Sequence, residues 1–280
     1  MDYLELTVNL SPREPWSEIL VSQLAELGFE SFVDTDSGIQ AYGQVADLNM
    51  NEVKKETLLS GENNDVKIDY QEKIIPQQNW NALWEADFQP VDVDGRMTIL
   101  APFHSRENVK GMIVEIQPQM SFGTGHHQTT WMMSKALMDL KEMPANVLDM
   151  GTGTGVLAIL AEKLGAKEIL AIDIEDWSVE NTKENAVRND CSKITALCGD
   201  VDLIAGQKFD LILANINKNI LKRHLSTYSE ALVSGGKIYL SGFFETDADE
   251  LIALGKTLNL KHDHTLNKET WAALCLVKQS

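Results

Sequence analysis

Hydrophobic and polar positions in the first 70 residues switch repeatedly between a two-residue period and the spacing of a helix. Alternating apolar positions predict strands at residues 3–8, 32–34, 38–42 and 66–70. Helical spacing predicts helices at residues 12–27 and 47–59, the first of them ended by Gly28. The resulting order, β-α-β-β-α-β, is the split βαβ arrangement of a small ferredoxin-like α+β domain.

Residues 72–90 have a different pattern, with Pro76 and a polar run followed by Trp80 and Trp84 at helical i, i+4 spacing. We interpret this segment as a linker that runs into a short helix, with the tryptophans as packing anchors between domains. The sequence therefore predicts a domain at 1–71, a linker at 72–90 and a second domain at 91–280.

The second domain repeats a pattern of strand, glycine turn and helix. Two strands, at 97–101 and 112–116, precede it, and apolar runs then predict strands at 147–150, 169–172, 193–197, 211–214 and 237–241. Such runs are typical of parallel strands buried on both faces. The last segments, 258–262 and 271–277, predict an antiparallel pair at the sheet edge. The fold class is α/β, a Rossmann-like doubly wound sheet.

Length and charge constrain the partners. The chain has 280 residues, enough for two domains, and a formal net charge of -18. Residues 1–70 contain 14 acidic and 4 basic residues. Such a segment repels nucleic-acid backbones and attracts basic proteins, although a merely solvated acidic surface explains the composition equally well. We expect no direct binding to nucleic acid.

Cysteine usage and the N-terminus indicate a cytoplasmic protein without a membrane segment. Three cysteines, an odd number without metal-ligand spacing, predict reduced thiols in the core. The N-terminus MDYLELTVNL is acidic where a signal peptide is basic. Apolar runs stay well below the roughly 18 residues of a membrane span.

A glycine loop, DMGTGTG, begins at Asp149 directly after a predicted strand. Gly151 and Gly153 let the backbone approach a ligand, and the following helix presents free N–H groups to an anion. A dinucleotide fingerprint counted from Gly151 requires glycine where Val156 stands, whereas counted from Gly153 its looser form accepts Ala158. The dinucleotide alternative is weakened but stays open.

Two acidic residues follow later strands and suit a nucleoside. Asp173, at the end of the next strand, stands where a carboxylate accepts hydrogen bonds from two ribose hydroxyls. Asp200, in the sequence CGD, suits the amino group of adenine, although a turn cap is the commoner role for such a residue alone.

A second glycine loop, FGTGHHQTT, occupies residues 122–130. Two glycine loops this close in sequence are able to enclose one small ligand from both sides. His126 and His127 are adjacent, so their side chains point apart, and the sequence offers no third metal ligand. We therefore predict no catalytic metal, and we expect His127 to support the loop by hydrogen bonding rather than to act as a general base.

The glycine loop, the two acidic residues and a strand that ends in ANIN occur in an order that resembles the class I methyltransferases, which use S-adenosyl-L-methionine. This resemblance covers residues 145–277. The upstream loop resembles the FGTGxHxTT motif of the PrmA family, methyltransferases of the large-subunit stalk ribosomal protein number eleven. The motif is matched position by position at Phe122, Gly123, Thr124, Gly125, His127, Thr129 and Thr130. Gln119 and Ser121 depart from the glycine and alanine that are common in that family before the loop.

The resemblance implies methyl transfer from S-adenosylmethionine to lysine side chains and to the N-terminal amine of that ribosomal protein. It also implies an N-terminal domain that recognises the substrate, and a mobile linker. Asn215 is then the residue that orients the acceptor amine, although asparagine there also serves as an ordinary turn residue. The resemblance also implies which residues bind the cofactor. They are Phe122, Thr124, Gly125, Thr129, Thr130, Asp149, Gly151, Gly153, Asp173, Asp200 and Asn215. The structural alternative for the threonines is that one of them caps a helix beginning near Gln128.

Two other functions remain open. A related methyltransferase acting on another amine or amide, such as glutamine or a nucleic-acid base, often carries NPPY after the fourth strand, where this chain has NINK at 215–218. A non-catalytic module that senses S-adenosylmethionine while docking on a ribosomal protein has the same cofactor-binding residues.

Overall fold

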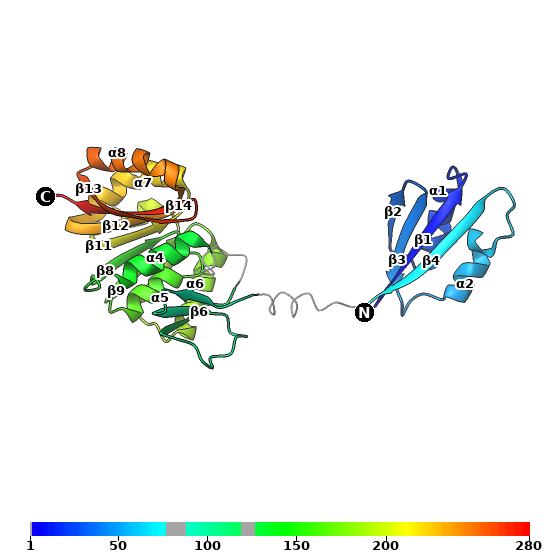
Figure 1. Ribbon diagram of the computed structural model, residues 1–280, viewed down its shortest axis with the longest axis horizontal. Helices are drawn as coiled ribbons and strands as arrows, with labels where there is room; N and C mark the ends of the chain where they lie inside the picture. The colour runs from blue at the N-terminus through cyan, green and yellow to red at the C-terminus, as the bar shows by residue number, and fades with distance from the viewer. Residues whose placement is uncertain (1, 77–87, 119–126) are drawn as a thin grey trace. The chain divides into compact units, whose positions relative to one another are not determined.

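Contacts between residues divide the chain into two units, Met1–Asp87 and Phe88–Ser280, here called the N-terminal and C-terminal units (Figure 1). The computed structural model describes residues 2–76, 88–118 and 127–280. The last described strand of the N-terminal unit continues to Ile75, four residues beyond the predicted end of the domain. The predicted helix with Trp80 and Trp84 lies outside the described residues.

The N-terminal unit has the predicted β-α-β-β-α-β order. Its strands form one antiparallel sheet in the order β2-β3-β1-β4. The elements are β1 (Tyr3–Ser11), α1 (Trp16–Glu26), β2 (Ser31–Thr35), β3 (Gly38–Gln44), α2 (Met50–Glu56) and β4 (Lys67–Ile75).

Alternation along β1 explains why this sheet covers one core. Leu6 and Val8 are fully buried and share a hydrophobic cluster with Leu20 and Leu24 of α1, one helical turn apart. Residues between them, such as Thr7, lie on the opposite face of the sheet. One face of the sheet is therefore packed under helices and the other is polar.

The C-terminal unit contains a seven-stranded sheet in the order β10-β9-β8-β11-β12-β14-β13. The strands from β10 to β12 are parallel, and β14 is antiparallel to both of its neighbours, as predicted for the edge. The strands are β8 (Asn146–Met150), β9 (Glu168–Asp173), β10 (Ile194–Cys198), β11 (Phe209–Asn215), β12 (Leu232–Phe244), β13 (Leu260–Lys268) and β14 (Trp271–Lys278).

Helices cover both faces of this sheet, so the unit is doubly wound (Figure 1). In β11, Leu211 and Leu213 belong to one core cluster and Ile212 and Ala214 to another, one on each face. The first cluster includes residues of α4 (Gln128–Met138), α5 (Val156–Lys163) and α6 (Asp176–Arg188). The second includes residues of α7 (Lys218–Ala231) and α8 (Ala248–Thr257).

A small sheet, β5-β6-β7, packs into the first of these clusters. The strands β6 (Met97–Leu100) and β7 (Met112–Glu115) were predicted, but β5 (Val91–Val93) was not, because three residues are too few to show alternation. The prediction that the cysteines lie in the core is wrong for Cys198, which is exposed, whereas Cys275 is buried. Among the described helices, none is both long and apolar enough to cross a membrane.

Candidate functional site

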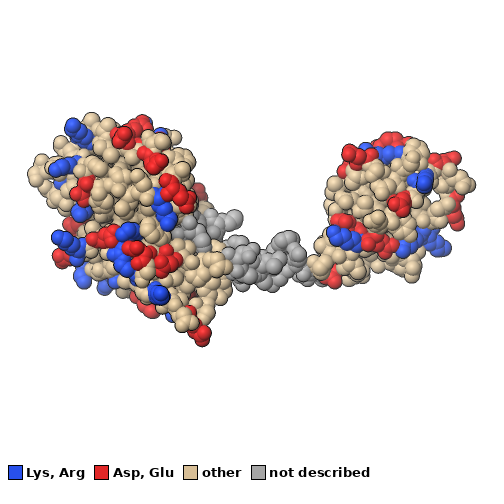
Figure 2. Space-filling model, viewed as in Figure 1, with Lys and Arg blue, Asp and Glu red and all other residues tan. Residues whose placement is uncertain are grey.

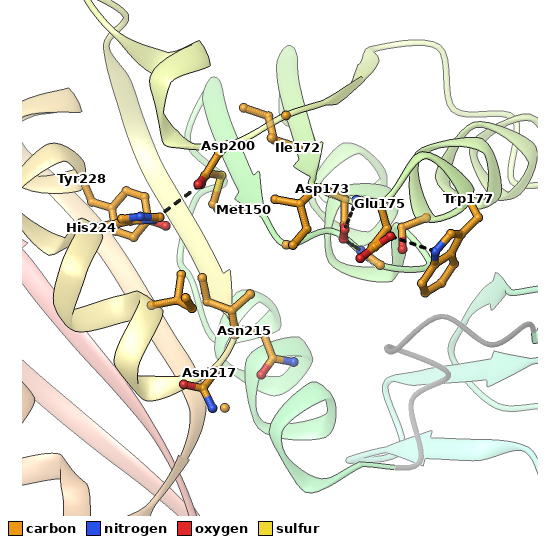
Figure 3. Close-up of a pocket in the computed structure, with 18 of the residues that line it drawn as sticks. Met150, Ile172, Asp173, Glu175, Trp177, Asp200, Asn215, Asn217, His224 and Tyr228 are labelled. Atoms are coloured by element: carbon orange, nitrogen blue, oxygen red, sulfur yellow. Dashed lines mark hydrogen bonds and ion pairs between the residues drawn. The ribbon is translucent and has the colours of Figure 1, made fainter.

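A cavity of about 510 Å³ opens at the carboxyl ends of the parallel strands in the C-terminal unit (Figure 3). It lies where the chain order reverses: β9 and β10 extend the sheet to one side of β8, and β11 and β12 extend it to the other. Ligands bind at such switch points in open α/β sheets. The volume is in the range of pockets that hold cofactors.

The glycine loop after β8 forms one wall of this cavity. Gly151 has φ +75°, and a Cβ atom there would lie 2.1 Å from Cγ2 of Ile216, which also lines the cavity. Gly153 has φ +57° and lines the same wall. Glycine is therefore required at position 151 both for backbone conformation and for space.

Asp149 lies beneath the glycine loop and does not line the cavity. Its side chain is buried, and Oδ2 accepts a hydrogen bond of 2.8 Å from the hydroxyl of Thr152. Burial raises the pKa of Asp149 to about 7, against the lowering effect of that hydrogen bond. In this position Asp149 stabilises the conformation of the glycine loop. The sequence analysis instead predicted that Asp149 contacts the cofactor.

Asp173 ends β9 and faces the cavity beside the loop (Figure 3). Its Oδ2 accepts a hydrogen bond of 2.9 Å from the N–H of Gly153, and Oδ1 accepts one of 3.1 Å from the N–H of Glu175. Each carboxylate oxygen has a second acceptor site. The carboxylate is thus held in place by two backbone amides while it retains acceptor capacity for ligand hydroxyls.

Asp200 lies at the far end of the cavity from Asp173 in the view of Figure 3, next to two side chains of α7. Its Oδ1 accepts a hydrogen bond of 2.7 Å from the N–H of Val201, so it also caps the short 3₁₀ helix η2 (Val201–Ile204). The same oxygen is 3.6 Å from Nδ1 of His224. Asp200 therefore caps a turn and also lines the cavity, so its position is compatible with both of the roles that the sequence left open.

Asn215 ends β11 and presents its amide to the cavity. Its Nδ2 donates a hydrogen bond of 3.4 Å to Oγ1 of Thr130, which is fully buried. Its Oδ1 is buried and lacks a hydrogen-bond partner among the described residues. Because a buried amide oxygen without a partner is unfavourable, this oxygen is well placed to accept a hydrogen bond from a bound donor.

The cap of α4 decides an alternative that the sequence left open. The helix begins at Gln128 as predicted, but the capping side chain is that of His127 rather than a threonine, since Nδ1 of His127 accepts from the N–H of Thr129 at 3.3 Å. Nδ1 also lies 2.8 Å from the Oγ1 atom of Thr129. The imidazole lines the cavity, with its ring centroid 4.5 Å from that of Trp271, and burial lowers the pKa of His127.

Two buried asparagines, one on α6 and one at its C-terminal cap, connect the glycine loop after β8 to the segment before the upstream glycine loop. Asn185 donates a hydrogen bond of 2.9 Å to the carbonyl of Thr154, and its Oδ1 accepts one of 2.9 Å from the N–H of Gln117. Asn189, one turn further on, bonds both backbone groups of Glu115. One helix face thus positions two segments that are far apart in the sequence.

Some predicted residues fall outside the cavity or outside the described residues. Phe122, Thr124 and Gly125 belong to the segment that the structure does not describe. Thr129 and Thr130 are buried behind the wall and reach it through His127 and Asn215.

Other cavity residues were not identified from the sequence. They include Ile172, Ile174, Trp177, Ile216, Ile220, His224, Tyr228 and Trp271. Most are apolar and resemble ordinary core positions in the pattern. For His224 and Tyr228, the only signal in the sequence is their i, i+4 spacing beside buried leucines.

A cluster of side chains with metal-ligand chemistry lies outside the cavity. Ligand atoms of Asp263, His264 and Cys275, on β13 and β14, lie within 4.8 Å of one another. These residues do not line the cavity. The prediction that no metal takes part in catalysis stays a prediction.

Comparisons with known proteins agree over nearly the whole chain. Residues 18–279 match the family model described as ribosomal protein L11 methyltransferase (PrmA). The ribosomal protein L11 methyltransferase of Porphyromonas gingivalis is 41% identical over 285 residues, covering 98% of this chain and 97% of the relative. That of Phocaeicola vulgatus is 40% identical and covers 98% of both chains.

Solved structures match more than half of the chain. The crystal structure of ribosomal protein L11 methylase from Lactobacillus delbrueckii subsp. bulgaricus superposes with a TM-score of 0.63 at 27% identity, covering 69% of this chain and 100% of that chain. A methyltransferase from Pyrococcus furiosus superposes with a TM-score of 0.51 at 18% identity, covering 60% of this chain and 90% of that chain, and this likeness concerns the fold alone.

Proposed function

Because the chain belongs to the ribosomal protein L11 methyltransferase (PrmA) family, we propose that it transfers methyl groups from S-adenosylmethionine to lysine and N-terminal amines of ribosomal protein L11. The observation that carries the chemical part of this proposal is the unpartnered Oδ1 atom of Asn215 at the cavity wall. It is a buried acceptor, on a residue that lines the cavity, and it still lacks a donor among the described residues.

The residues of the cavity fit S-adenosylmethionine. Asp173 offers two fixed carboxylate oxygens to ribose hydroxyls, and the wall at Gly151 and Gly153 has no side chains that would block the approach of a ligand. Ile172 and Met150 provide apolar surface between Asp173 and Asp200, suited to a flat base (Figure 3). When bound, S-adenosylmethionine supplies an electrophilic methyl group on a positively charged sulfur.

Asn215 orients the acceptor amine. Its Nδ2 donates to Thr130, which fixes the amide plane, and its Oδ1 is left without a partner among the described residues. An acceptor nitrogen that donates an N–H to Oδ1 would have its lone pair directed away from the asparagine. Since methyl transfer is an in-line displacement, such an alignment of the acceptor favours the reaction.

The acceptor must lose its proton before it attacks. A free lysine has a pKa of about 10.4, and desolvation in an enclosed site lowers this value. The imidazole of His127, which also lines the cavity, has a pKa lowered by burial. It is therefore neutral near pH 7 and adds no positive charge to the cavity wall. The prediction that His127 is not the general base agrees with the use of its Nδ1 in the cap of α4.

We assign recognition of L11 to residues 1–71. The support is the composition, since residues 1–70 contain 14 acidic against 4 basic residues, and a basic ribosomal protein is attracted to such a segment. Figure 2 shows acidic and basic side chains interspersed on the visible faces of both units.

The test uses purified, unmethylated L11 with the full chain and S-adenosylmethionine. We expect mass gains in steps of one methyl group, and Asn215→Ala should lower the rate about 100-fold with little change in cofactor affinity. Asn215→Ala with an unchanged rate removes the assigned role. Cofactor binding without any product, under every condition tried, supports instead a sensor module.

Deletion of residues 1–71 tests recognition separately. The truncated chain should bind S-adenosylmethionine as the full chain does, which also shows that it is folded, while methylation of L11 is lost. Retained methylation of the same amines contradicts the assignment of recognition to this domain.

A further inference from the structure

The hairpin at the edge of the large sheet brings three side chains with metal-ligand chemistry together, away from the cavity (Figure 1). The ligand atoms of Asp263, His264 and Cys275 lie within 4.8 Å of one another. Asp263 and His264 belong to β13, which ends the order of strands in that sheet, and Cys275 belongs to its neighbour β14. Because a hairpin turn separates them in the sequence, they lack the short spacing that marks most zinc sites.

A bulge in β13 explains why two adjacent side chains meet the same partner. The register passes from His262 opposite Leu276 to His264 opposite Cys275, so Asp263 is the extra residue of the bulge. In a regular strand, adjacent side chains point to opposite faces of the sheet. Here Nδ1 of His264 lies 3.0 Å from Oδ2 of Asp263. The bulge therefore places a carboxylate and an imidazole together beside one thiol.

The distances suit one tetrahedral ion after a small movement of the exposed side chains. Bonds of about 2.0–2.3 Å to such an ion place its ligand atoms about 3.3–3.6 Å apart. The side chains of His264 and Asp263 are 42% and 47% exposed, which leaves them room to adjust. Cys275 is fully buried, so the core fixes its position. The cluster thus combines one rigid ligand with two adjustable ones.

We propose that Asp263, His264 and Cys275 bind one divalent cation of the zinc class, which ties the edge strand to its neighbour. One sulfur, one nitrogen and one carboxylate oxygen suit Zn²⁺, whereas Mg²⁺ and Ca²⁺ prefer oxygen ligands alone. Cys275 binds as a thiolate, so its proton is released when the ion binds. Three protein ligands leave the fourth position to water.

The position of the site indicates a structural role. A bulge interrupts the hydrogen-bond ladder between two strands, and β13 lies at the edge of the sheet. An ion bound to both strands supplies a new connection at that interruption. The three ligands do not line the cofactor cavity, so this inference is independent of methyl transfer. We expect Zn²⁺ to raise the melting temperature of the C-terminal unit and to leave cofactor affinity unchanged.

The test uses the full chain without an affinity tag, in a non-thiol reductant, with Co²⁺ as a spectroscopic probe. Thiolate-bound Co²⁺ has a charge-transfer band in the near ultraviolet. We expect one equivalent of Co²⁺ to produce this band, one equivalent of Zn²⁺ to remove it, and Cys275→Ser to abolish it. Cys198→Ser is the matched control, since Cys198 is exposed and lies outside the cluster, and it should leave the band unchanged.

Two surface variants make the test independent of any change in the core. His264→Ala and Asp263→Asn alter exposed side chains, and each should weaken Zn²⁺ binding by at least about tenfold in competition with a chromophoric chelator. His262→Ala is their control, because His262 precedes the bulge and bonds Thr265 instead. It should leave the affinity for Zn²⁺ unchanged.

Several results would overturn the inference. The absence of the band at several equivalents of Co²⁺, or a band that persists in Cys275→Ser, excludes Cys275 as a ligand. Zn²⁺ binding that His264→Ala and Asp263→Asn leave unchanged shows that the cluster is only a surface ion pair beside a buried thiol. A melting temperature that Zn²⁺ does not raise contradicts the tie between the strands. The proposed function stands in each case, because methylation of L11 tests it separately.

Discussion

Two hydrogen bonds of Asn185 connect the glycine loop after β8 to the segment that precedes the upstream glycine loop. We predict that this one side chain holds the two segments together. Asn185 is fully buried on α6, donates to the carbonyl of Thr154 at 2.9 Å and accepts from the N–H of Gln117 at 2.9 Å. Asn185→Leu has nearly the same shape and removes both hydrogen bonds at once. Two backbone groups are then left buried and unpaired.

The magnitude follows from those two groups. Each unpaired buried backbone group costs about 1–3 kcal/mol, so together they cost about 2–6 kcal/mol. Leucine avoids the cost of burying an amide, which places the expected loss in the lower part of that range, about 2–4 kcal/mol. For a unit of this size, the melting temperature should fall by about 5–12 °C.

Thermal unfolding of the full chain, with and without S-adenosylmethionine, measures this effect. The transition that the cofactor raises belongs to the C-terminal unit, and this transition should move in Asn185→Leu. Cofactor affinity should also fall about tenfold, because the wall at Gly153 loses its support. Glu184→Leu, on the exposed side of the same helix, is the control and should change the melting temperature by less than about 2 °C. A melting temperature of Asn185→Leu within that same margin refutes the reasoning.

Three further predictions concern the cavity wall and the buried carboxyl beneath it. Asp149 has a pKa of about 7 in the folded chain against 3.8 as its ordinary value, so the unfolded state binds fewer protons between those values and stability falls as pH rises through this window. The unfolding free energy of the wild type minus that of Asp149→Asn should therefore fall by about 3 kcal/mol between pH 4.5 and 7.5 in urea titrations, and a constant difference contradicts the buried, neutral carboxyl. Asp173→Ala should weaken binding of S-adenosylmethionine about 100-fold by calorimetry, since two charge-assisted hydrogen bonds to ribose are lost, and unchanged affinity removes Asp173 from the site. Gly151→Ala should abolish cofactor binding because its Cβ meets Ile216, and adding Ile216→Ala should restore part of it; no restoration means that backbone strain at φ +75° dominates.

Most of the fold was predictable because burial leaves a clear pattern in the sequence. Parallel strands buried on both faces produce the apolar runs of β8, β9 and β11, and the alternation of β1 follows from one buried face. The strand β5 was missed because its three residues show no period. The end of β4 was placed too early, since its last residues are polar or exposed and resemble a linker.

The sequence predicts the position of a site residue where a polar side chain stands at the end of a predicted strand. It does not do so for residues that packing alone brings to the cavity. Asp173 and Asn215 end strands, so their position at the carboxyl edge follows from the topology. The pattern of the glycine loop does not reveal that Asp149 points beneath the loop, because that depends on its contact with Thr152. His224 and Tyr228 come from a helix whose apolar neighbours predict a core face, and only the packed structure shows their polar atoms at the cavity.

The most direct test of the account is intact-mass analysis of a ribosomal-protein extract from cells that lack this protein, incubated with the purified chain and S-adenosylmethionine. We predict mass gains in steps of one methyl group confined to L11, and their absence when Asn215→Ala replaces the wild type. Gains on other proteins while L11 stays unmodified contradict the proposed substrate. No gain on any protein, although the chain binds the cofactor, contradicts its assignment as the enzyme.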